Sequence, residues 1–191
     1  MRIAALALAA ALLLALATAH ADYEDGVNAA HSGDYATALK EFSSAAEAGL
    51  DLAQYNLAIL YFTGNGVEQD YVAALRWTLA AAEQGHLNAQ FNLAALYYTG
   101  TGTAVNLQDA LTWYTRAAQG QHGGAQYNVA TMYELGEGTA QDLEQAYFWA
   151  SAAQYNENAE AAALLARLAD SMTPTQLSAA RTRFARWVLE Q

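Results

Sequence analysis

In this 191-residue chain, the side chains best suited to binding a metal ion are three of the four histidines. His86 and His122 lie 36 residues apart, and His31 lies upstream of both. Zinc sites usually take ligands from neighbouring positions, such as two residues one helical turn apart. A spacing of 36 is not of this kind, and it coincides with a repeat of the chain described below. We therefore expect no metal site and no cofactor.

Other catalytic patterns are equally weak. Glu134 and Glu137 could cooperate in acid–base chemistry, but they fall near a predicted loop, and we interpret them as solvated side chains. The sequence has no nucleophile elbow, no HExxH motif and no P-loop lysine. Gly64 and Gly66 follow a predicted helix, so they cannot hold a phosphate at a helix N-terminus. The sequence predicts a protein that is not an enzyme.

The elements that position these side chains follow an internal repeat of 36 residues. The segment Leu52-Ala-Gln-Tyr-Asn-Leu-Ala58 returns as Asn88-Ala-Gln-Phe-Asn-Leu-Ala94 and as Gly124-Ala-Gln-Tyr-Asn-Val-Ala130. The same spacing relates Gly64 and Gly66 to Gly100 and Gly102 and to Gly136 and Gly138, Asp70 to Asn106 and Asp142, and Trp77 to Trp113 and Trp149. Such a period is typical of helical repeat architectures.

Each unit is predicted to form two helices. Apolar residues over 52–62 fall at helical spacings on two faces, as in a helix packed on both sides. Gly64 can end this helix in the left-handed conformation. Asp70 is a preferred N-cap, so a second helix is expected over Tyr71–Glu83. Small residues such as Ala74 allow close helix packing, and the tryptophans 77, 113 and 149 are expected in the core.

The repeat continues in weaker form at both ends. A second-type helix is expected from Asp34 to Ala48, with a shorter partner over Asp22–Ala30. A first-type helix is expected over Asn158–Asp170, and a capping box at Thr173 opens a final helix. We predict an all-α fold, a right-handed α-solenoid of antiparallel helix hairpins. Its parts are a degenerate N-terminal hairpin (22–51), three repeats (52–87, 88–123 and 124–159) and C-terminal capping helices (160–191).

The N-terminus has the pattern of a secretory signal peptide. Arg2 precedes an apolar run, which ends at Ala19-His-Ala21 before acidic residues. We predict a signal peptide over 1–21, with cleavage after Ala21 favoured over an uncleaved anchor. The run is shorter than the roughly 20 residues that a membrane span needs. We expect a periplasmic or secreted protein with no membrane span after cleavage.

Charge restricts the partners. The chain carries a net charge of −11, and residues 22–160 hold 17 acidic residues against three basic ones. Nucleic acid binding depends on Lys and Arg neutralising phosphates, so we expect no nucleic acid partner. The acidity serves either solubility or a preference for a basic protein partner. We expect a monomer.

The repeated residues resemble the Sel1-like repeat family, a relative of the tetratricopeptide repeats. The resemblance rests on Ala-x-Tyr/Phe-Asn-Leu/Val-Ala, the tyrosines 61, 97 and 133, Gly-x-Gly, Ala-x-x-Trp and the stretch that ends at Gly85-His86. It covers residues 52–159. Gly120-Gln121 reverses the Gln84-Gly85 order, so this junction is expected to be looser. The resemblance implies a secreted bacterial scaffold or adaptor that binds another protein.

By analogy with tetratricopeptide arrays, the first helices would line a binding groove. The resemblance implies the following partner-binding residues: Tyr55, Asn56, Ile59, Phe62, Phe91, Asn92, Tyr98, Tyr127, Asn128 and Glu134. The asparagines could bind a partner or could hydrogen-bond the neighbouring turn. The rings of Tyr55, Phe91 and Tyr127 could form a recognition strip or pack between hairpins. A second hypothesis is an envelope factor that binds glycan or peptidoglycan through these aromatic side chains.

Overall fold

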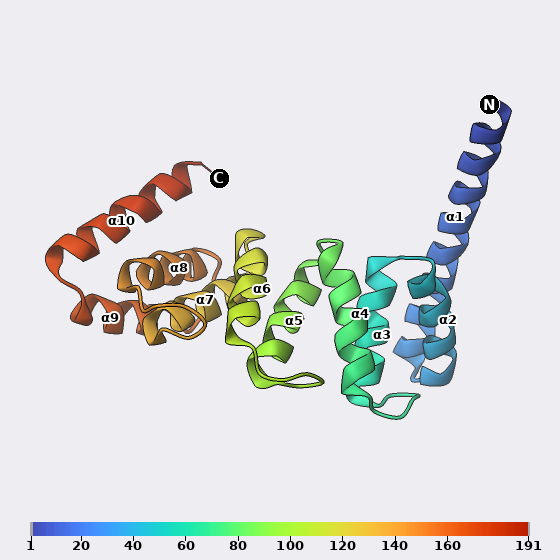
Figure 1. Ribbon diagram of the computed structural model, residues 1–191, viewed down its shortest axis with the longest axis horizontal. Helices are drawn as coiled ribbons and strands as arrows, with labels where there is room; N and C mark the ends of the chain where they lie inside the picture. The colour runs from blue at the N-terminus through green and yellow to red at the C-terminus, as the bar shows by residue number, and fades with distance from the viewer. Residues whose placement is uncertain (1, 191) are drawn as a thin grey trace. The chain divides into compact units, whose positions relative to one another are not determined.

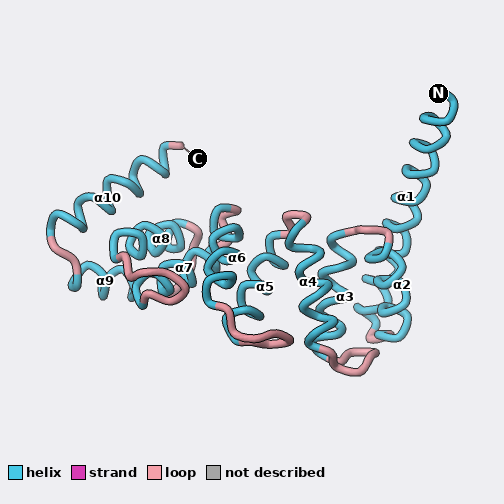
Figure 2. The backbone as a smooth tube through the Cα atoms, in the orientation of Figure 1, coloured by secondary structure: helices cyan, strands magenta, loops and turns pink. Residues whose placement is uncertain are grey.

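The computed structural model describes the backbone of residues 2–190 and the side chains of residues 17–190. Within this range the chain is all-helical, with ten α-helices and no strand (Figures 1 and 2). The helices are α1 (Arg2–Ser32), α2 (Tyr35–Glu47), α3 (Asp51–Thr63), α4 (Tyr71–Glu83), α5 (Leu87–Thr99), α6 (Leu107–Gln119), α7 (Gly123–Leu135), α8 (Leu143–Tyr155), α9 (Ala161–Ser171) and α10 (Pro174–Leu189). The predicted 36-residue spacing of paired helices is confirmed.

Local signals at the helix ends act as predicted. Gly64 ends α3 with φ of 74°, and its N–H donates to the Leu60 carbonyl. The Asp70 carboxylate accepts hydrogen bonds from the first free amides of α4, at Val72 and Ala73, each at 2.9 Å. Thr173 and Gln176 form the capping box that opens α10. These contacts satisfy backbone groups that a helix end otherwise leaves unpaired.

Small side chains let the helices approach closely. The alanines at equivalent positions of the second helices are at most 1% exposed: Ala38, Ala74, Ala110 and Ala146, and Ala45, Ala81, Ala117 and Ala153. Of the three tryptophans at the repeated position, Trp113 is buried, whereas Trp77 and Trp149 are half-buried and pack against the cores. An arginine guanidinium lies over the ring of each of two tryptophans. Its central carbon is 5.0 Å from the ring centroid for Arg76 over Trp77, and 4.3 Å for Arg116 over Trp113.

A buried glutamine in the repeated Ala-Gln pair ties successive hairpins together. Gln54 donates to the Ala46 carbonyl at the end of α2 and accepts from Gln84, which caps α4. Gln126 does the same two repeats later, donating to Ala118 and accepting from Asn156. Both side chains are therefore satisfied where they are buried, and their loss would leave polar groups unpaired.

The chain divides into two compact units within α5. Unit 1 holds residues 1–89 and 101–103, and unit 2 holds residues 90–100 and 104–191. In unit 1, the buried residues of α1, α2 and α3, among them Phe42 and Leu57, form one core. In unit 2, α7, α8, α9 and α10 meet around Ala150, Leu164 and Leu168. Each unit therefore has its own hydrophobic core.

The two ends differ from the sequence-based expectation. The short helix expected over 22–30 is the last part of α1, which continues to Ser32, so only Gly33 and Asp34 separate it from α2. The helix expected over 158–170 begins later, at Ala161. Helices α9 and α10 both pack on α8.

Most side chains of the predicted signal peptide fall outside the described residues. Side chains are described from Ala17 onward, and Ala19 is 2% exposed within the unit 1 core. Within the described residues, no helix has the length and apolar character needed to cross a membrane.

Candidate functional site

Unit 1 contains a pocket between α3 and the preceding α1–α2 hairpin. It has a volume of about 460 Å³ and is lined by Tyr23, Val27, Ala30, His31, Tyr35, Phe42, Asn56, Ile59, Leu60 and Asn65. The Asn56 amide donates to the Tyr23 hydroxyl at 3.4 Å, and the rings of Tyr23 and Phe42 pack at 5.9 Å. We call this the unit 1 pocket. It brings together Asn56 and Ile59, two of the residues predicted to bind a partner.

Unit 2 contains a smaller pocket between α7 and the α5–α6 hairpin. It has a volume of about 140 Å³ and is lined by Tyr98, Tyr114, Asn128, Thr131, Met132 and Glu137. The Tyr98 hydroxyl donates to Oε2 of Glu137 at 2.8 Å, and Asn128 hydrogen-bonds the Tyr114 hydroxyl. We call this the unit 2 pocket. It brings together the predicted residues Tyr98 and Asn128 and adds Glu137, which was not among the predicted residues.

The two pockets occupy the same place in the repeat. Five lining positions of the unit 1 pocket return two repeats later in the unit 2 pocket: Phe42 as Tyr114, Asn56 as Asn128, Ile59 as Thr131, Leu60 as Met132 and Asn65 as Glu137. An aromatic pair flanks each one, Tyr23 with Phe42 and Phe91 with Tyr114. The backbone therefore builds one type of pocket, and the side chains give each copy its own chemistry.

The charge of the unit 2 pocket comes from Glu137. The Glu137 carboxylate accepts a hydrogen bond from the Tyr98 hydroxyl, which raises the pKa of Tyr98 above its ordinary value. Burial raises the pKa of Tyr114 to about 12. Both phenols therefore stay protonated near neutral pH. They supply hydroxyl groups and ring faces but no charge.

Two of the three rings proposed as a recognition strip stack on histidine rings of the same chain. Tyr55 stacks on His86 with ring centroids 4.5 Å apart, and Phe91 stacks on His122 at 4.4 Å. Tyr127 is half-buried and packs against the unit 2 core. These contacts favour the interpretation of the three rings as packing between hairpins.

The histidines at the start of the first helices have a structural role that the sequence pattern did not reveal. Nδ1 of His86 accepts the Ala89 amide at 3.2 Å, and Nδ1 of His122 accepts the Ala125 amide at 3.1 Å. Each imidazole thus caps a helix while its ring stacks on an aromatic side chain. Burial lowers the pKa of His122, which keeps Nδ1 available as an acceptor. Among the described side chains, no cluster of three or more His, Asp or Glu could hold a metal ion.

The remaining predicted residues lie outside the two pockets. Phe62 is 44% exposed and packs edge-on against Tyr71 at 5.2 Å. Asn92 is half-buried and in contact with a neighbouring group. Glu134 is bound in a bidentate ion pair by Arg167, at 2.7 and 2.8 Å. The interpretation as a solvated loop acid is therefore wrong for Glu134, which lies in α7 with its side chain 14% exposed, whereas Glu137 does lie in the loop after α7 and accepts from Tyr98.

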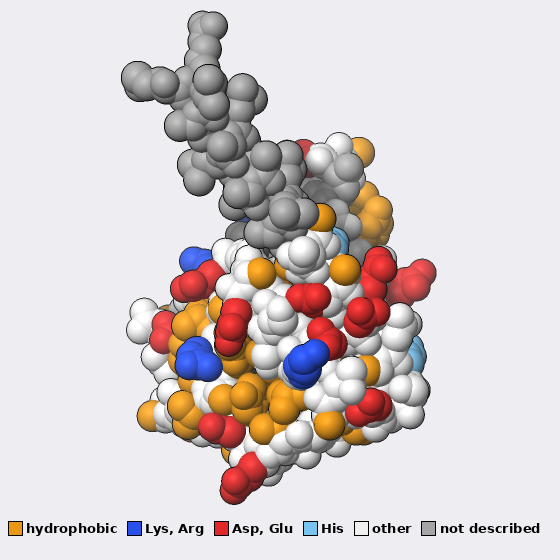
Figure 3. Space-filling model, turned by 90° about the vertical axis from the view of Figure 1, so that its right-hand side faces the viewer, with side chains coloured by type: hydrophobic (Ala, Val, Ile, Leu, Met, Phe, Trp, Pro, Cys, Tyr) orange, Lys and Arg blue, Asp and Glu red, His pale blue; other side chains and the backbone are white. Residues whose placement is uncertain are grey.

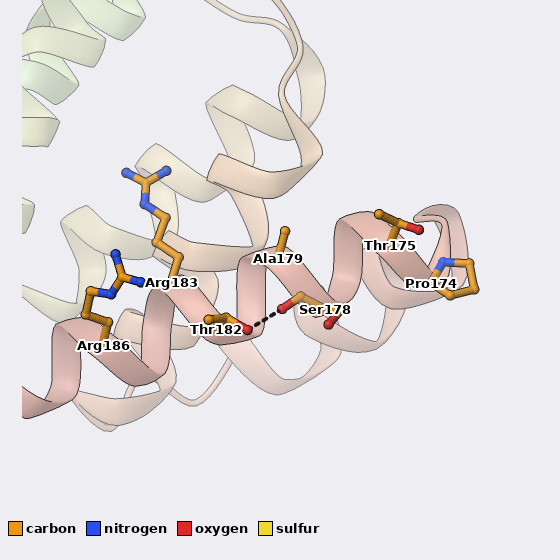
Figure 4. Close-up of a pocket in the computed structure, with 7 residues that line it drawn as sticks. All are labelled: Pro174, Thr175, Ser178, Ala179, Thr182, Arg183 and Arg186. Atoms are coloured by element: carbon orange, nitrogen blue, oxygen red, sulfur yellow. Dashed lines mark hydrogen bonds between the residues drawn. The ribbon is translucent and has the colours of Figure 1, made fainter.

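A third hollow lies along α10 (Figure 4). Its lining residues all come from that one helix: Pro174, Thr175, Ser178, Ala179, Thr182, Arg183 and Arg186. It therefore has no opposing wall, and Arg183 already lies over the Phe148 ring at 4.6 Å. On the face shown in Figure 3, acidic side chains are more prominent than basic ones.

Comparison with known proteins shows which family has this architecture. The family model described as Sel1 repeat matches residues 51–86, 87–122 and 124–153, more than half of the chain. The chain belongs to the Sel1 repeat family. Sel1 repeats form helical scaffolds that typically serve as protein-interaction modules. No curated protein matched the chain.

Two solved structures show the same fold. A Sel1 repeat protein from Oxalobacter formigenes is 31% identical, with a TM-score of 0.71, and the match covers 75% of this chain and 59% of that protein. The second is c5321, described as a protective antigen of uropathogenic Escherichia coli strains with an SLR fold. It is 30% identical, with a TM-score of 0.78, and the match covers 88% of this chain and 38% of that protein. The chain thus spans only part of the length of either relative.

Proposed function

We propose that this Sel1 repeat chain is a non-enzymatic scaffold of the cell envelope or the secreted space. It binds a protein partner through the pockets that its first helices form with the preceding hairpins. The observation that carries the proposal is the recurrence of one pocket at equivalent positions two repeats apart. A pocket that recurs in the repeat suits the binding of side chains of a partner protein.

The exposed parts of the pockets support this proposal. Ile59 is 36% exposed, and Tyr35 is 37% exposed at the edge of the same pocket. In the unit 2 pocket, Tyr98 is 38% exposed. Tyrosine in particular offers rigid apolar area together with a polar tip, which is useful at an interface.

Photo-crosslinking tests the proposed binding surface. A photoreactive amino acid replaces Ile59 or Thr131 in the mature chain, which is then irradiated in envelope extract. Val72 supplies the matched control, because it is an exposed apolar residue (66%) on the second helix α4. We expect a discrete cross-linked protein at positions 59 and 131 and none at 72. Substitution of Tyr55 or Tyr127 is less suitable, since both rings pack within the chain.

Three outcomes would contradict the proposal. Equal cross-linking at position 72 would place the interface elsewhere. Binding to purified saccharide without any protein cross-link would favour the glycan-binding alternative. Turnover of an envelope substrate that is abolished by one polar substitution would make the chain an enzyme.

The proposed location has its own test. Expression of the full chain in a bacterial host, followed by fractionation and N-terminal sequencing, should give a periplasmic or secreted protein that begins at Asp22. A protein that retains residues 1–21 in the membrane fraction would show an uncleaved anchor instead.

A further inference from the structure

The unit 2 pocket carries a negative charge that no basic side chain neutralises. Within residues 17–190, the contact of the Glu137 carboxylate is the Tyr98 hydroxyl, and no ion pair involves Glu137. Arg167 of α9 pairs instead with Glu134, donating from Nε and Nη2 to its two carboxylate oxygens. Because Tyr98 occupies only Oε2, Oε1 of Glu137 remains available to a ligand.

The walls of this pocket suit a cation with an apolar stem. Two tyrosine rings, Tyr98 and Tyr114, line the cavity, and an aromatic face attracts a cation within about 6 Å. Met132, which is 2% exposed, adds a polarisable thioether that packs well against methylene groups. A carboxylate beside aromatic rings therefore favours a ligand that is positive at its tip and hydrocarbon behind it.

Size and hydrogen-bond capacity indicate a single ammonium group. A cavity of about 140 Å³ is well below the roughly 300 Å³ that drug-sized ligands need, so it accommodates one side chain. Asn128 and Thr131 line the pocket, and each has a side-chain oxygen that can accept a hydrogen bond, since the Thr131 hydroxyl uses only its proton on the Tyr127 carbonyl. With Glu137, these groups provide three acceptors, which matches the three N–H donors of an ammonium ion.

We propose that the unit 2 pocket binds the ammonium group of a lysine side chain on the protein partner. The inference rests on the proposed function and adds the chemistry of one subsite. Lysine fits better than arginine, because the planar guanidinium is best recognised by two free oxygens of one carboxylate. One oxygen of Glu137 is already taken by Tyr98.

The unit 1 pocket provides an internal comparison. Asn65 replaces Glu137 at the equivalent position, so the unit 1 pocket has no acidic lining residue. Its aromatic lining is retained, since Tyr23, Tyr35 and Phe42 all line it, so the carboxylate is the main chemical difference between the two pockets. The unit 1 pocket is also larger, at about 460 Å³. We expect it to discriminate against a charged side chain.

The test is an NMR titration of the isotope-labelled mature chain with Nα-acetyl-lysine methylamide. We expect saturable shifts of amides near Tyr98, Asn128 and Glu137, with weak millimolar affinity. The norleucine analogue has nearly the same stem without the charge and should bind at least about tenfold more weakly. Glu137→Gln should weaken lysine binding by a similar factor, and Tyr98→Leu should weaken it about threefold to tenfold.

The reciprocal variant Asn65→Glu keeps the test independent of any loss of folding. We expect it to create a second set of lysine-dependent shifts around Asn56 and Ile59. Equal binding of lysine and norleucine, or unchanged lysine binding in a folded Glu137→Gln variant, would overturn the lysine assignment. Persistent cross-links at positions 59 and 131 would then leave the scaffold proposal standing. Lysine binding without any protein cross-link would instead contradict the scaffold proposal, and with it the assignment to a partner's lysine, while the affinity of the pocket for an ammonium group would stand.

Discussion

At the scale of single residues, the turn between repeats shows how one backbone conformation accepts different side chains. The left-handed position of this turn is Gly49 (φ 95°), Gly85 (φ 92°), Gln121 (φ 65°) and Glu157 (φ 61°). The sequence suggested a looser junction at Gly120-Gln121, but Gln121 adopts the same left-handed conformation and His122 still caps the next helix. The turn therefore keeps one backbone conformation whatever its side chain, and non-glycine residues adopt it under strain.

This strain predicts that Glu157→Gly stabilises the chain. A left-handed non-glycine residue costs about 1–2 kcal/mol, and glycine returns about 0.5–1 kcal/mol of that as backbone entropy. We expect the free energy of unfolding, measured with a chemical denaturant, to rise by about 0.5–1 kcal/mol. Glu157→Ala removes the same carboxylate without relieving the backbone, so it serves as the control and should not stabilise. An equal gain in both variants would mean that the charge, not the conformation, is responsible.

His122 predicts a pH dependence of stability. Burial lowers its pKa in the folded chain below the unfolded value of 6.5, so folding favours the neutral imidazole. The stabilisation is complete above pH 6.5 and is lost as the pH falls through 6.5 toward the folded pKa. Protonation also removes the Nδ1 acceptor that caps α7. We expect the melting temperature to fall between pH 7.5 and 5.

Two variants isolate this contribution. His122→Asn keeps a good N-cap that does not titrate, so its melting temperature should change less over the same pH range. It is less stable overall, because the ring stacked on Phe91 is lost. His31→Asn changes an exposed histidine and should keep the slope of the parent chain. Parallel profiles for the parent and His122→Asn would show that another group causes the pH dependence.

At the scale of helices and loops, the second glycine of each Gly-x-Gly loop is a stacking contact. A Cβ on Gly66, Gly102 or Gly138 would overlap the carbonyl oxygen of the first residue of the preceding second helix. Those residues, Tyr35, Tyr71 and Leu107, are themselves 36 apart. The loop therefore joins two helices and also contacts the backbone at the start of an earlier helix.

The contact predicts that Gly102→Ala costs more than an ordinary left-handed glycine does. Gly85→Ala is the matched control, because Gly85 has φ of 92° and a Cβ added there would meet no atom within 4 Å. We expect Gly85→Ala to lower the free energy of unfolding by about 1–2 kcal/mol. Gly102→Ala should lower it by a further amount of about 1–3 kcal/mol, from overlap with the Tyr71 backbone. Equal losses in denaturant unfolding would show that the backbone at Tyr71 moves away freely.

At the scale of the whole molecule, the dominant feature is the excess of acidic residues, with a net charge of −11. Like charges repel in the folded chain, and salt screens this repulsion. We expect the melting temperature to rise by about 2–4 °C between 10 and 150 mM NaCl at neutral pH. Near pH 4, where most carboxylates are partly protonated, the rise should be smaller. A fall at neutral pH would mean that salt-sensitive attractions outweigh the repulsion.

The sequence by itself determined the helices, their pairing and the caps made by aspartate, glycine and threonine. These features depend on residues within a turn or two of one another, as with Asp70 and the amides of α4 or Thr173 and Gln176. The 36-residue period then repeated each local signal three times. The exceptions lie at the ends, where α1 runs on to Ser32 and α9 begins at Ala161, because the repeat pattern is weakest there.

Only the tertiary structure decided which side chains face each other in the pockets. Tyr98 and Glu137 are 39 residues apart, and Glu134 and Arg167 are 33 apart, so no local pattern relates them. Comparison of equivalent repeat positions could have singled out Glu137 against Asn65, but not its tyrosine partner. A pocket forms where two hairpins meet, and its chemistry depends on side chains that the backbone repeat leaves free to vary.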